Sequence, residues 1–564
     1  MGHTFQDSLD SKSGGQVLQK VLIIFLPLVA GLLAVELLQP ITTRIVHYRP
    51  GLIFEALLAA AGLAVLFSQI RYSDTSNAIK ILVRGLAICL GLYGLSLGSS
   101  VPRLDPTINI TDFQNYAWLV VVVCTVLSLF RPAFAAVPII FVVFHKEISR
   151  YYAGAEHLGR NDYLPLVEVG LFLVAATCTI GLLKRVLALE TPEADSTVED
   201  GEVAHQHSIS IAIILAVAIG AHFGNYFQSG VAKIILDGGV QSWVLENPTS
   251  SLMLAGYNLG TNPLSVYPPL FGFIYTIFRE VDVVSNIVTL AFQFFCFLAF
   301  FRVRYIIATC LFFDVMHVAI FLLTGALFLP WIILNSLIVA ACLTVRGDRL
   351  PNIAIVLGVI ATILGNTVFY NAKLGWYDSR QIRAAYFTAV DAEGHEHVVP
   401  SNFYMSASYL LLVRHFDYFE HKRASEHVPT SAWGQIGIGN HHAEFRKMSD
   451  HSTMRLTKTC SYPLETNVQT VDFDLEKARS FIVAHHAWAI QQADEDGKLA
   501  YDLYPHHHFS MPIERFEGFR KLDLRNIVAY HYNVETSCLD WKDGAFQKEI
   551  MAKTRSEPIV VKRP

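Results

Sequence analysis

The stretch Ser208-Ile-Ser-Ile-Ala-Ile-Ile-Leu-Ala-Val-Ala-Ile-Gly-Ala-His-Phe-Gly-Asn-Tyr-Phe-Gln-Ser-Gly-Val-Ala-Lys233 starts as a membrane-like apolar run and turns polar partway along. In a helix with about 100° per residue, one face carries a polar stripe made of His222, Tyr226, Ser229 and Lys233, with Asn225 at its margin. An isolated ionisable group that faces lipid costs roughly 3 kcal/mol or more. We therefore expect this stripe to face protein or a partly hydrated cavity.

The opposite face of the same segment carries small residues four positions apart. Ala216, Gly220 and Gly224 have little or no side chain, so a second helix can approach them closely. The sequence thus predicts a neighbouring helix packed against this face.

Apolar runs of membrane-spanning length recur through the first two thirds of the chain. A hydrocarbon core of about 30 Å needs about 20 apolar residues at about 1.5 Å per residue. The runs that meet or approach this length are residues 21–38, 52–70, 81–97, 116–144, 164–183, 209–227, 283–301, 305–345 and 353–369. Pro132 interrupts one long run, and Gly325 and Pro330 interrupt another, so each is either two spans or one broken helix. We expect roughly nine to eleven spans.

The composition changes sharply near residue 371, from apolar runs to polar, charged sequence. The sequence predicts an all-α polytopic membrane bundle over residues 17–371, after a polar N-terminal tail of residues 1–16. A smaller α+β soluble domain, residues 372–564, is expected to follow and to lie against the membrane. Within the bundle, residues 190–207 are acidic and lack apolar periodicity, which predicts a loop. The first apolar run lacks a clear cleavage site and is typical of a signal anchor.

Composition also argues against several functions. The net charge is -5 and no basic arm is present, so nucleic-acid binding is not expected. Of the 8 cysteines, only Cys460 and Cys538 lie in the polar tail, where they can pair if it faces an oxidising compartment. Fourteen of the 22 histidines are in this tail, but their spacings match no metal motif. We expect no metal site.

Local signals define several elements of the tail. Residues 384–400 read as a β-hairpin, because β-prone runs flank the turn Asp391-Ala-Glu-Gly394. Residues 475–493 are a helix candidate with Asp474 as the N-cap. Two further strands are expected at residues 525–532 and 559–561.

Other ionisable residues lie within or beside apolar runs. Asp314 and His317 are one helical turn apart, so the carboxylate could orient the imidazole ring. Asp162 and Glu168 begin another run and could face the same cavity. The structural alternative is that the Asp314–His317 pair joins two helices and that His222 only hydrogen-bonds a neighbouring helix.

Three motifs carry a family resemblance. They are Tyr226-Phe-Gln-Ser-Gly-Val-Ala-Lys-Ile-Ile-Leu-Asp237 followed by Trp243, Asn161-Asp-Tyr-Leu164, and Phe312-Phe-Asp-Val-Met-His317 followed by Gly325 and Leu329-Pro-Trp331. They resemble, in that order, the Y-F-x-A-G-x-x-K-L-x-x-D-W, N-H-x-Y-L and F-H-x-x…G-x-x-x-F-P segments of the vitamin K-dependent γ-carboxylase-like membrane proteins, often called the HTTM family. The match extends over residues 52–345 and is strongest at these motifs.

The resemblance implies roles for the polar stripe. The family's A-G-x-K lysine deprotonates a reduced quinone, and by position this lysine is Lys233, whereas Asp162 replaces the family's histidine. The implied catalytic residues are Lys233 as the base, with His222, Asp314 and His317 as relay or orienting groups. The expected substrate-binding residues are Asn225, Tyr226, Ser229, Asp162 and Glu168. A lysine acts as a base only when neutral, a form that burial favours. Without the resemblance, a lysine that snorkels to the membrane surface is the default interpretation.

We therefore expect an integral membrane enzyme of the γ-carboxylase-like class, a carboxylase-like lyase or oxidoreductase. It would use base catalysis on a lipid-soluble or quinol-like substrate, with a reduced quinone as the implied cofactor. The alternative is a non-catalytic subunit, or an assembly or docking factor, of a larger membrane complex such as a respiratory complex. The expected location is a bacterial inner membrane, with the lipid bilayer, a lipid-soluble small molecule and membrane proteins as partners. Charged groups that converge on one cavity would favour an enzyme, whereas dispersed groups would favour a scaffold.

Overall fold

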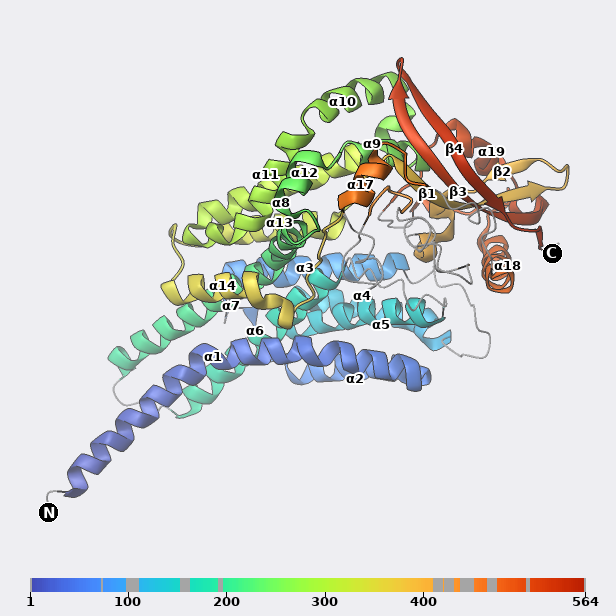
Figure 1. The fold of residues 1–564 in the computed structure, drawn as a ribbon. Helices are drawn as coiled ribbons and strands as arrows, with labels where there is room; N and C mark the ends of the chain where they lie inside the picture. Colours follow the sequence, from blue (N-terminus) through green and yellow to red (C-terminus); the bar gives the residue numbers. More distant parts are fainter. Residues whose placement is uncertain are drawn as a thin grey trace.

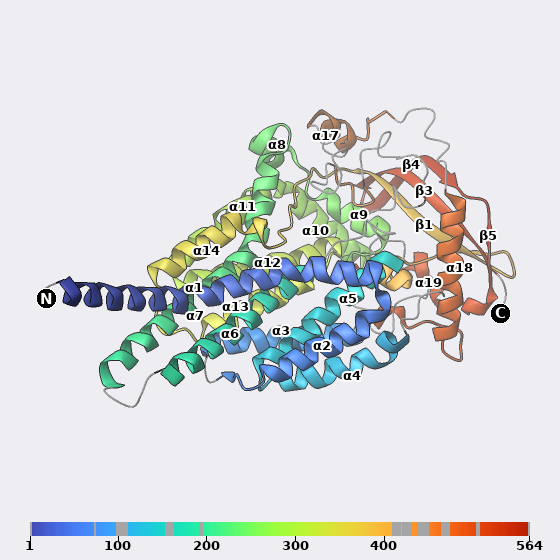
Figure 2. The same ribbon diagram turned by 90° about the horizontal axis from the view of Figure 1, so that it is seen from below.

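The chain forms a helical bundle that is followed by an α+β domain (Figure 1). A computed structural model describes residues 3–72, 75–97, 111–152, 163–190, 196–408, 419, 431–436, 451–463, 474–503 and 508–561. The long helices lie side by side, and the sheet stands beyond one end of them (Figure 2).

Helices account for most of the bundle. They are α1 (His3–Tyr48), α2 (Ile53–Leu66), α3 (Asn77–Leu97), α4 (Thr111–Ser128), α5 (Ala136–Tyr152), α6 (Leu164–Glu190), α7 (Ser196–Ile234), α11 (Asp282–Phe295), α12 (Val303–Thr324), α13 (Leu329–Cys342) and α14 (Asn352–Leu364). In the described part of the chain, 6 segments are long and apolar enough to cross a membrane: Val21–Tyr48, Asn77–Leu95, Leu164–Val186, Gln206–Ile234, Asp282–Phe301 and Val303–Thr324. Shorter apolar helices are Pro50–Leu66, Tyr116–Ser128, Leu329–Cys342 and Asn352–Thr367. The described residues thus contain six segments of spanning length, fewer than the nine to eleven expected, because the other predicted runs form shorter apolar helices.

Both interrupted apolar runs are two helices. The first run breaks at the 3-10 turn Pro132–Ala135, between α4 and α5, because proline removes a helical hydrogen bond. The second breaks after α12 at Gly325, whose φ is +83°. A Cβ there would lie 2.1 Å from the carbonyl oxygen of Thr261, so the turn needs glycine.

Two boundaries differ from those expected. Helix α1 begins at His3, within the polar segment expected as a tail, and α7 begins at Ser196, within the acidic segment expected as a loop. A helix that is already nucleated gains one hydrogen bond for each residue added, so it can extend through sequence without apolar periodicity.

Helix α7 packs closely against α14 through the small-residue face. A Cβ at Gly220 would lie 2.5 Å from the carbonyl oxygen of Gly358 on α14, and one at Gly224 would lie 2.9 Å from the side chain of Asn371. The predicted close approach is therefore confirmed. On the polar side of α7, His222 and Tyr226 lie toward α13 and α12.

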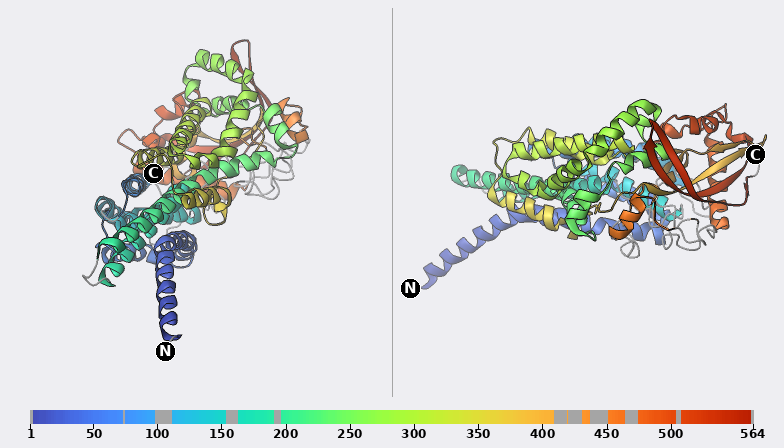
Figure 3. Two further views of the ribbon diagram at one scale, coloured as in Figure 1. Left: turned by 90° about the vertical axis from the view of Figure 1, so that its left-hand side faces the viewer. Right: turned by 45° about the horizontal axis from the view of Figure 1, so that its top comes forward.

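Short helices occupy residues 239–280. They are α8 (Gly239–Glu246), α9 (Ser251–Leu259), the 3-10 turn Pro263–Val266 and α10 (Pro268–Glu280). Helix α10 lies along the edge of the molecule near the tip of the sheet (Figures 1 and 3).

The tail domain contains an antiparallel sheet with strand order β2-β1-β3-β4, and β5 also pairs with β3. Its strands are β1 (Gln381–Asp391), β2 (Glu396–Val398), β3 (Ile527–Lys542), β4 (Ala545–Arg555) and β5 (Ile559–Val560). Helices α17 (His451–Lys458), α18 (Leu475–Gln492) and α19 (Glu514–Lys521) complete it. The predicted hairpin, the α18 helix and both later strands are confirmed, and Asp474 accepts a hydrogen bond from Lys477 N at 3.0 Å as the N-cap.

A disulfide joins Cys460, just after α17, to Cys538 on β3. The two residues are 78 positions apart, so the bond closes a long loop and restricts the unfolded chain. The other six cysteines are free and lie, buried or half-buried, in the bundle.

We predict that six thiols react with maleimide in denatured, unreduced protein and that all eight react after reduction. Intact mass spectrometry counts the adducts. Cys538→Ser is the control, because its seven thiols should react with or without reduction. Eight adducts on the unreduced wild-type protein would show that the bond does not form.

Candidate functional site

The polar stripe of α7 contacts two different neighbours. His222 and Tyr226 face α12 and α13, whereas Asn225, Ser229 and Lys233 face the chain that follows α14. Residues 370–378, which we call the connecting segment, join the bundle to the tail domain. The stripe therefore belongs to two separate groups of contacts.

Asn225 and Ser229 hold the connecting segment by hydrogen bonds. Asn225 Oδ1 accepts from Ala372 N at 2.9 Å, and Ser229 Oγ donates to Ala372 O at 3.0 Å. Ser229 Oγ also lies 3.3 Å from Leu374 N, which donates to it. These side chains supply hydrogen-bond partners for the backbone groups of residues 372–374, which follow α14 and belong to no helix or strand.

Lys233 also binds the connecting segment. Its ammonium donates to Leu374 O at 2.6 Å and to Ser229 O at 3.3 Å. It lies 5.2 Å from the centre of the Trp243 ring, a cation–π distance. The side chain is buried, so Lys233 does not snorkel to the surface.

Glu168 holds the start of the same segment from α6. Its Oε2 accepts from Tyr370 N at 2.7 Å. Glu168, Asn225, Ser229 and Lys233, all expected at a catalytic or substrate site, thus share one task, which is to fix the chain between bundle and tail. Asp162 lies outside the described residues.

The far end of the connecting segment is fixed by the short helices. Asn247 Nδ2 donates to Asp378 Oδ2 at 2.8 Å, and Trp376 Nε1 donates to Asp378 Oδ1 at 3.0 Å. Burial raises the pKa of Asp378 to about 7, although these hydrogen bonds and the Lys233 charge oppose the rise. Trp243 Nε1 donates to Trp376 O at 3.0 Å, which links the lysine's aromatic neighbour to the same segment.

Asn335 on α13 organises the other group of contacts, which we call the Asn335 cluster: His222, Tyr226, Asp314 and Asn335. Asn335 Oδ1 lies 2.8 Å from His222 Nε2, and Asn335 Nδ2 donates to Tyr226 OH at 2.9 Å and to Asp314 Oδ1 at 2.9 Å. Because the amide oxygen only accepts, Nε2 of His222 carries a proton. The other ring nitrogen, Nδ1, is buried without a hydrogen-bond partner among the described residues.

Aromatic rings enclose the buried part of this cluster. Tyr226 stacks on Phe313 with 3.6 Å between ring centres, and Trp331 meets Tyr226 edge-on at 5.2 Å. His317 is buried beside them, with its ring 5.7 Å from Tyr226 and 5.5 Å from Trp331. Asp314 does not orient His317 as expected, because its carboxylate instead accepts hydrogen bonds from Asn335 and Ser336.

Asp314 differs from the other members because it reaches the outer surface of the bundle. It is half-buried, and its Oδ2 accepts from the exposed Ser336 Oγ at 3.3 Å. Its neighbours on the same face of α12 are apolar, and Leu311 is 50% and Val315 70% exposed. A chain of hydrogen bonds therefore runs from the surface carboxylate through Asn335 to the buried imidazole.

Lys233 does not belong to the Asn335 cluster. It follows Tyr226 by seven residues, which is about 10 Å along a helix axis at about 1.5 Å per residue. Lys233 contacts the connecting segment, Ser229 and Trp243. The predicted catalytic residues thus divide into a cluster with Asp314 and His222, and a lysine elsewhere.

Two adjacent tail histidines, His485 and His486, are buried and serve as packing residues. His485 Nε2 lies 3.0 Å from Phe403 O, and His486 Nδ1 lies 3.0 Å from Tyr530 OH. Burial lowers the pKa of each imidazole to about 4. Among the described residues, no group of three or more His, Cys, Asp or Glu could hold a metal ion.

Comparison with known proteins adds no relative: no family model, no curated protein and no solved structure matches the chain.

Sequence reasoning did not single out Asn335 or the connecting segment. Asn335 lies in an apolar run and matches no motif, and its partner His222 is 113 residues away. The connecting segment has no helical or strand periodicity. A polar residue in an apolar run was the available signal for Asn335, because such a group needs a hydrogen-bond partner.

We predict that Lys233→Met destabilises the protein by about 1–3 kcal/mol, because the buried carbonyl of Leu374 loses its donor. Thermal unfolding in detergent should show a lower Tm. Lys373→Met removes the same charge from the residue next to Leu374, whose side chain makes none of the hydrogen bonds described above. It is the matched control and should have a smaller effect. An unchanged Tm for Lys233→Met would contradict a structural role.

We predict that the buried histidines lower the tail domain's stability in mild acid. The folded-state pKa of each is about 4 and the unfolded value about 6.5, so the unfolded chain binds more protons between these pH values. Their contribution is complete above pH about 6.5 and falls, by up to about 3 kcal/mol per histidine, toward pH about 4. A His485→Gln/His486→Gln variant should depend less on pH across this window in unfolding followed by circular dichroism. Parallel wild-type and variant curves would contradict this.

Proposed function

We propose that the chain is a multi-pass membrane enzyme that acts on a lipid-soluble, quinol-like substrate reached from within the bilayer. The observation that carries the proposal is the Asp314 carboxylate, which lies on the apolar outer face of α12 and is held from inside by Asn335. An ionisable group at such a position costs roughly 3 kcal/mol or more in hydrocarbon, and such groups usually mark function.

The arrangement suits abstraction of a proton. A substrate O–H approaching α12 would transfer its proton to a carboxylate oxygen of Asp314, and the electron pair of that bond would stay on the substrate oxygen. Asn335 and Ser336 hold the carboxylate in place, and His222 and Tyr226 fix the amide of Asn335. Asp314 is then the base, His222 is a positioning residue, and Lys233 has a structural part.

The proposal keeps the enzyme class implied by the resemblance, a carboxylase-like lyase or oxidoreductase with a reduced quinone as substrate or cofactor, but assigns the base differently. The segments long enough to cross a membrane support a multi-pass protein. The disulfide supports a tail domain on the oxidising side of that membrane, which for a bacterial inner membrane is the periplasm.

The second candidate is a non-catalytic subunit of a membrane complex. A polar helix of a partner could cover Asp314 and Ser336 and satisfy both within the bilayer, as polar residues do between membrane helices. The same observation, a polar pair on an apolar face, supports this function.

We predict that Asp314→Asn abolishes activity without loss of protein. The variant keeps the shape and an acceptor for Asn335 but cannot take a proton, so turnover should fall about 100-fold or more. Mass spectrometry of membrane lipid extracts would follow a species that accumulates when the gene is deleted and declines on complementation. Immunoblotting of membranes would measure the protein level.

Ser336→Ala is the matched control, because it removes one hydrogen bond to the same carboxylate and leaves its charge. It should retain most of the activity. Activity retained by Asp314→Asn would refute base catalysis. Loss of a co-purifying membrane partner from Asp314→Asn, with no lipid species changed, would establish the subunit function instead.

A further inference from the structure

A cavity of about 590 Å³ lies where the tail domain meets α9 and α10. We call it the seam cavity. Its lining from the bundle side includes Tyr257, Asn258, Ser265 and Val266, and from the tail side Arg515 and Lys548. This volume is within the range of about 300–1,000 Å³ typical of sites for small ligands.

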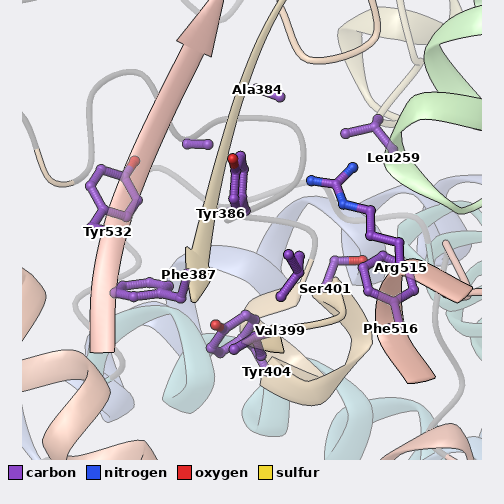
Figure 4. Close-up of a pocket in the computed structure, with 12 residues that line it drawn as sticks. Leu259, Ala384, Tyr386, Phe387, Val399, Ser401, Tyr404, Arg515, Phe516 and Tyr532 are labelled. Carbon is purple, nitrogen blue, oxygen red and sulfur yellow. The ribbon is translucent and has the colours of Figure 1, made fainter. Parts of the chain in front are cut away.

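Arg515, on α19, places a cation in this cavity. Its guanidinium lies 5.1 Å from the centre of the Tyr386 ring, and its Nη1 donates to Asn258 O at 2.5 Å. Figure 4 shows the guanidinium beside Tyr386 and Leu259, at a small void that shares Arg515 with the seam cavity. Within the described chain, Arg515 makes no direct ion pair with a carboxylate, although the buried Glu535 attracts it electrostatically. Arg515 and Lys548 place two positive charges beside this one buried carboxylate, and the excess positive charge favours binding of an anion.

Nearby acidic residues offset only part of the positive charge of Arg515 and Lys548. Glu535 is buried and ion-paired with Lys548, and it also accepts from Ser537 Oγ at 2.9 Å and from Tyr386 OH at 3.3 Å. Burial opposes its charge, but Lys548, Ser537 and the charge of Arg515 keep the pKa of Glu535 below its ordinary value. Glu514 also lines the cavity, but it is exposed, where solvent screens its charge.

The bundle side of the cavity continues into an exposed apolar surface. Val266 lines the cavity and is 50% exposed, and Pro268 begins α10. The outer face of α10 then presents Leu270, Phe273 and Ile277, of which Phe273 is 65% exposed. A short helix with one exposed apolar face is typical of the membrane interface.

We propose that the seam cavity binds the anionic phosphate head group of a membrane lipid, with Arg515 as its main partner and the acyl chains along the outer face of α10. The inference rests on the membrane placement of the helices but not on chemistry at Asp314. A lipid bound there would join the tail domain to the bilayer surface, since Arg515 comes from the tail and α10 from the bundle side.

The test uses the full chain in a neutral detergent and three water-soluble probes: dihexanoyl phosphatidylglycerol, dihexanoyl phosphatidylcholine and inorganic phosphate. Microscale thermophoresis gives each Kd. We expect phosphatidylglycerol to bind more tightly than either other probe. Arg515→Gln should weaken it about tenfold or more, because a charge-assisted hydrogen bond to phosphate is lost. The matched control is Arg479→Gln, an equal charge change on the exposed surface of α18.

Equal binding of phosphatidylglycerol and phosphatidylcholine would overturn the proposal, as would equal Kd values for wild type and Arg515→Gln. If inorganic phosphate binds as tightly as phosphatidylglycerol, the ligand is a soluble anion and the proposal of a lipid ligand is wrong. If Arg515→Gln does not fold, Val266→Glu places a negative charge at the exposed rim and should weaken binding, whereas Val560→Glu on β5 should not. Asp314→Asn should leave the lipid Kd unchanged. A failure of the enzymatic proposal can therefore be distinguished from a failure of the lipid-binding proposal.

Discussion

Polar groups within an apolar helical bundle must find partners in the protein, because hydrocarbon offers none. Helix α7 meets this constraint with two sets of contacts on one polar stripe. His222 and Tyr226 bind Asn335, while Asn225, Ser229 and Lys233 bind the connecting segment. On the small-residue face of α7, Gly220 allows α14 to pack closely. The chain that follows α14 then contacts Asn225, Ser229 and Lys233.

This arrangement separates the residues that anchor the tail domain from Asp314, the base that we propose. The lysine and Glu168 hold the backbone of residues 370–374, which fixes where the tail domain begins. The carboxylate of Asp314, in contrast, is hydrogen-bonded to the buried Asn335 but is itself only half-buried, at the outer surface of the bundle. It is therefore the acid–base group best placed to meet a molecule in the bilayer, whereas the ammonium of Lys233 is occupied by carbonyl oxygens.

Local signals in the sequence predicted local structure well. Pro132 and Gly325 lie at helix breaks, and Asp474 is an N-cap, as predicted. The hairpin turn at 391–394 was also predicted correctly. Each of these features depends only on residues close by in the sequence. The stripe on α7 was also visible from helical spacing. Its partners were not, because Asn335 and Ala372 lie 113 and 143 residues away from the side chains they bind, and such distances leave no periodic pattern. Spacing showed that the charged groups share a face but could not show that they contact different neighbours.

The most direct test is a cryo-electron microscopy structure of the full chain in lipid nanodiscs, which shows both side chains and the surrounding bilayer. We predict that the ammonium of Lys233 binds the carbonyl of Leu374. We also predict that the carboxylate of Asp314 binds Asn335 and faces acyl chains or a lipid-soluble molecule. A structure in which Lys233 and Asp314 line one shared cavity, or in which Asp314 faces bulk water, would contradict it.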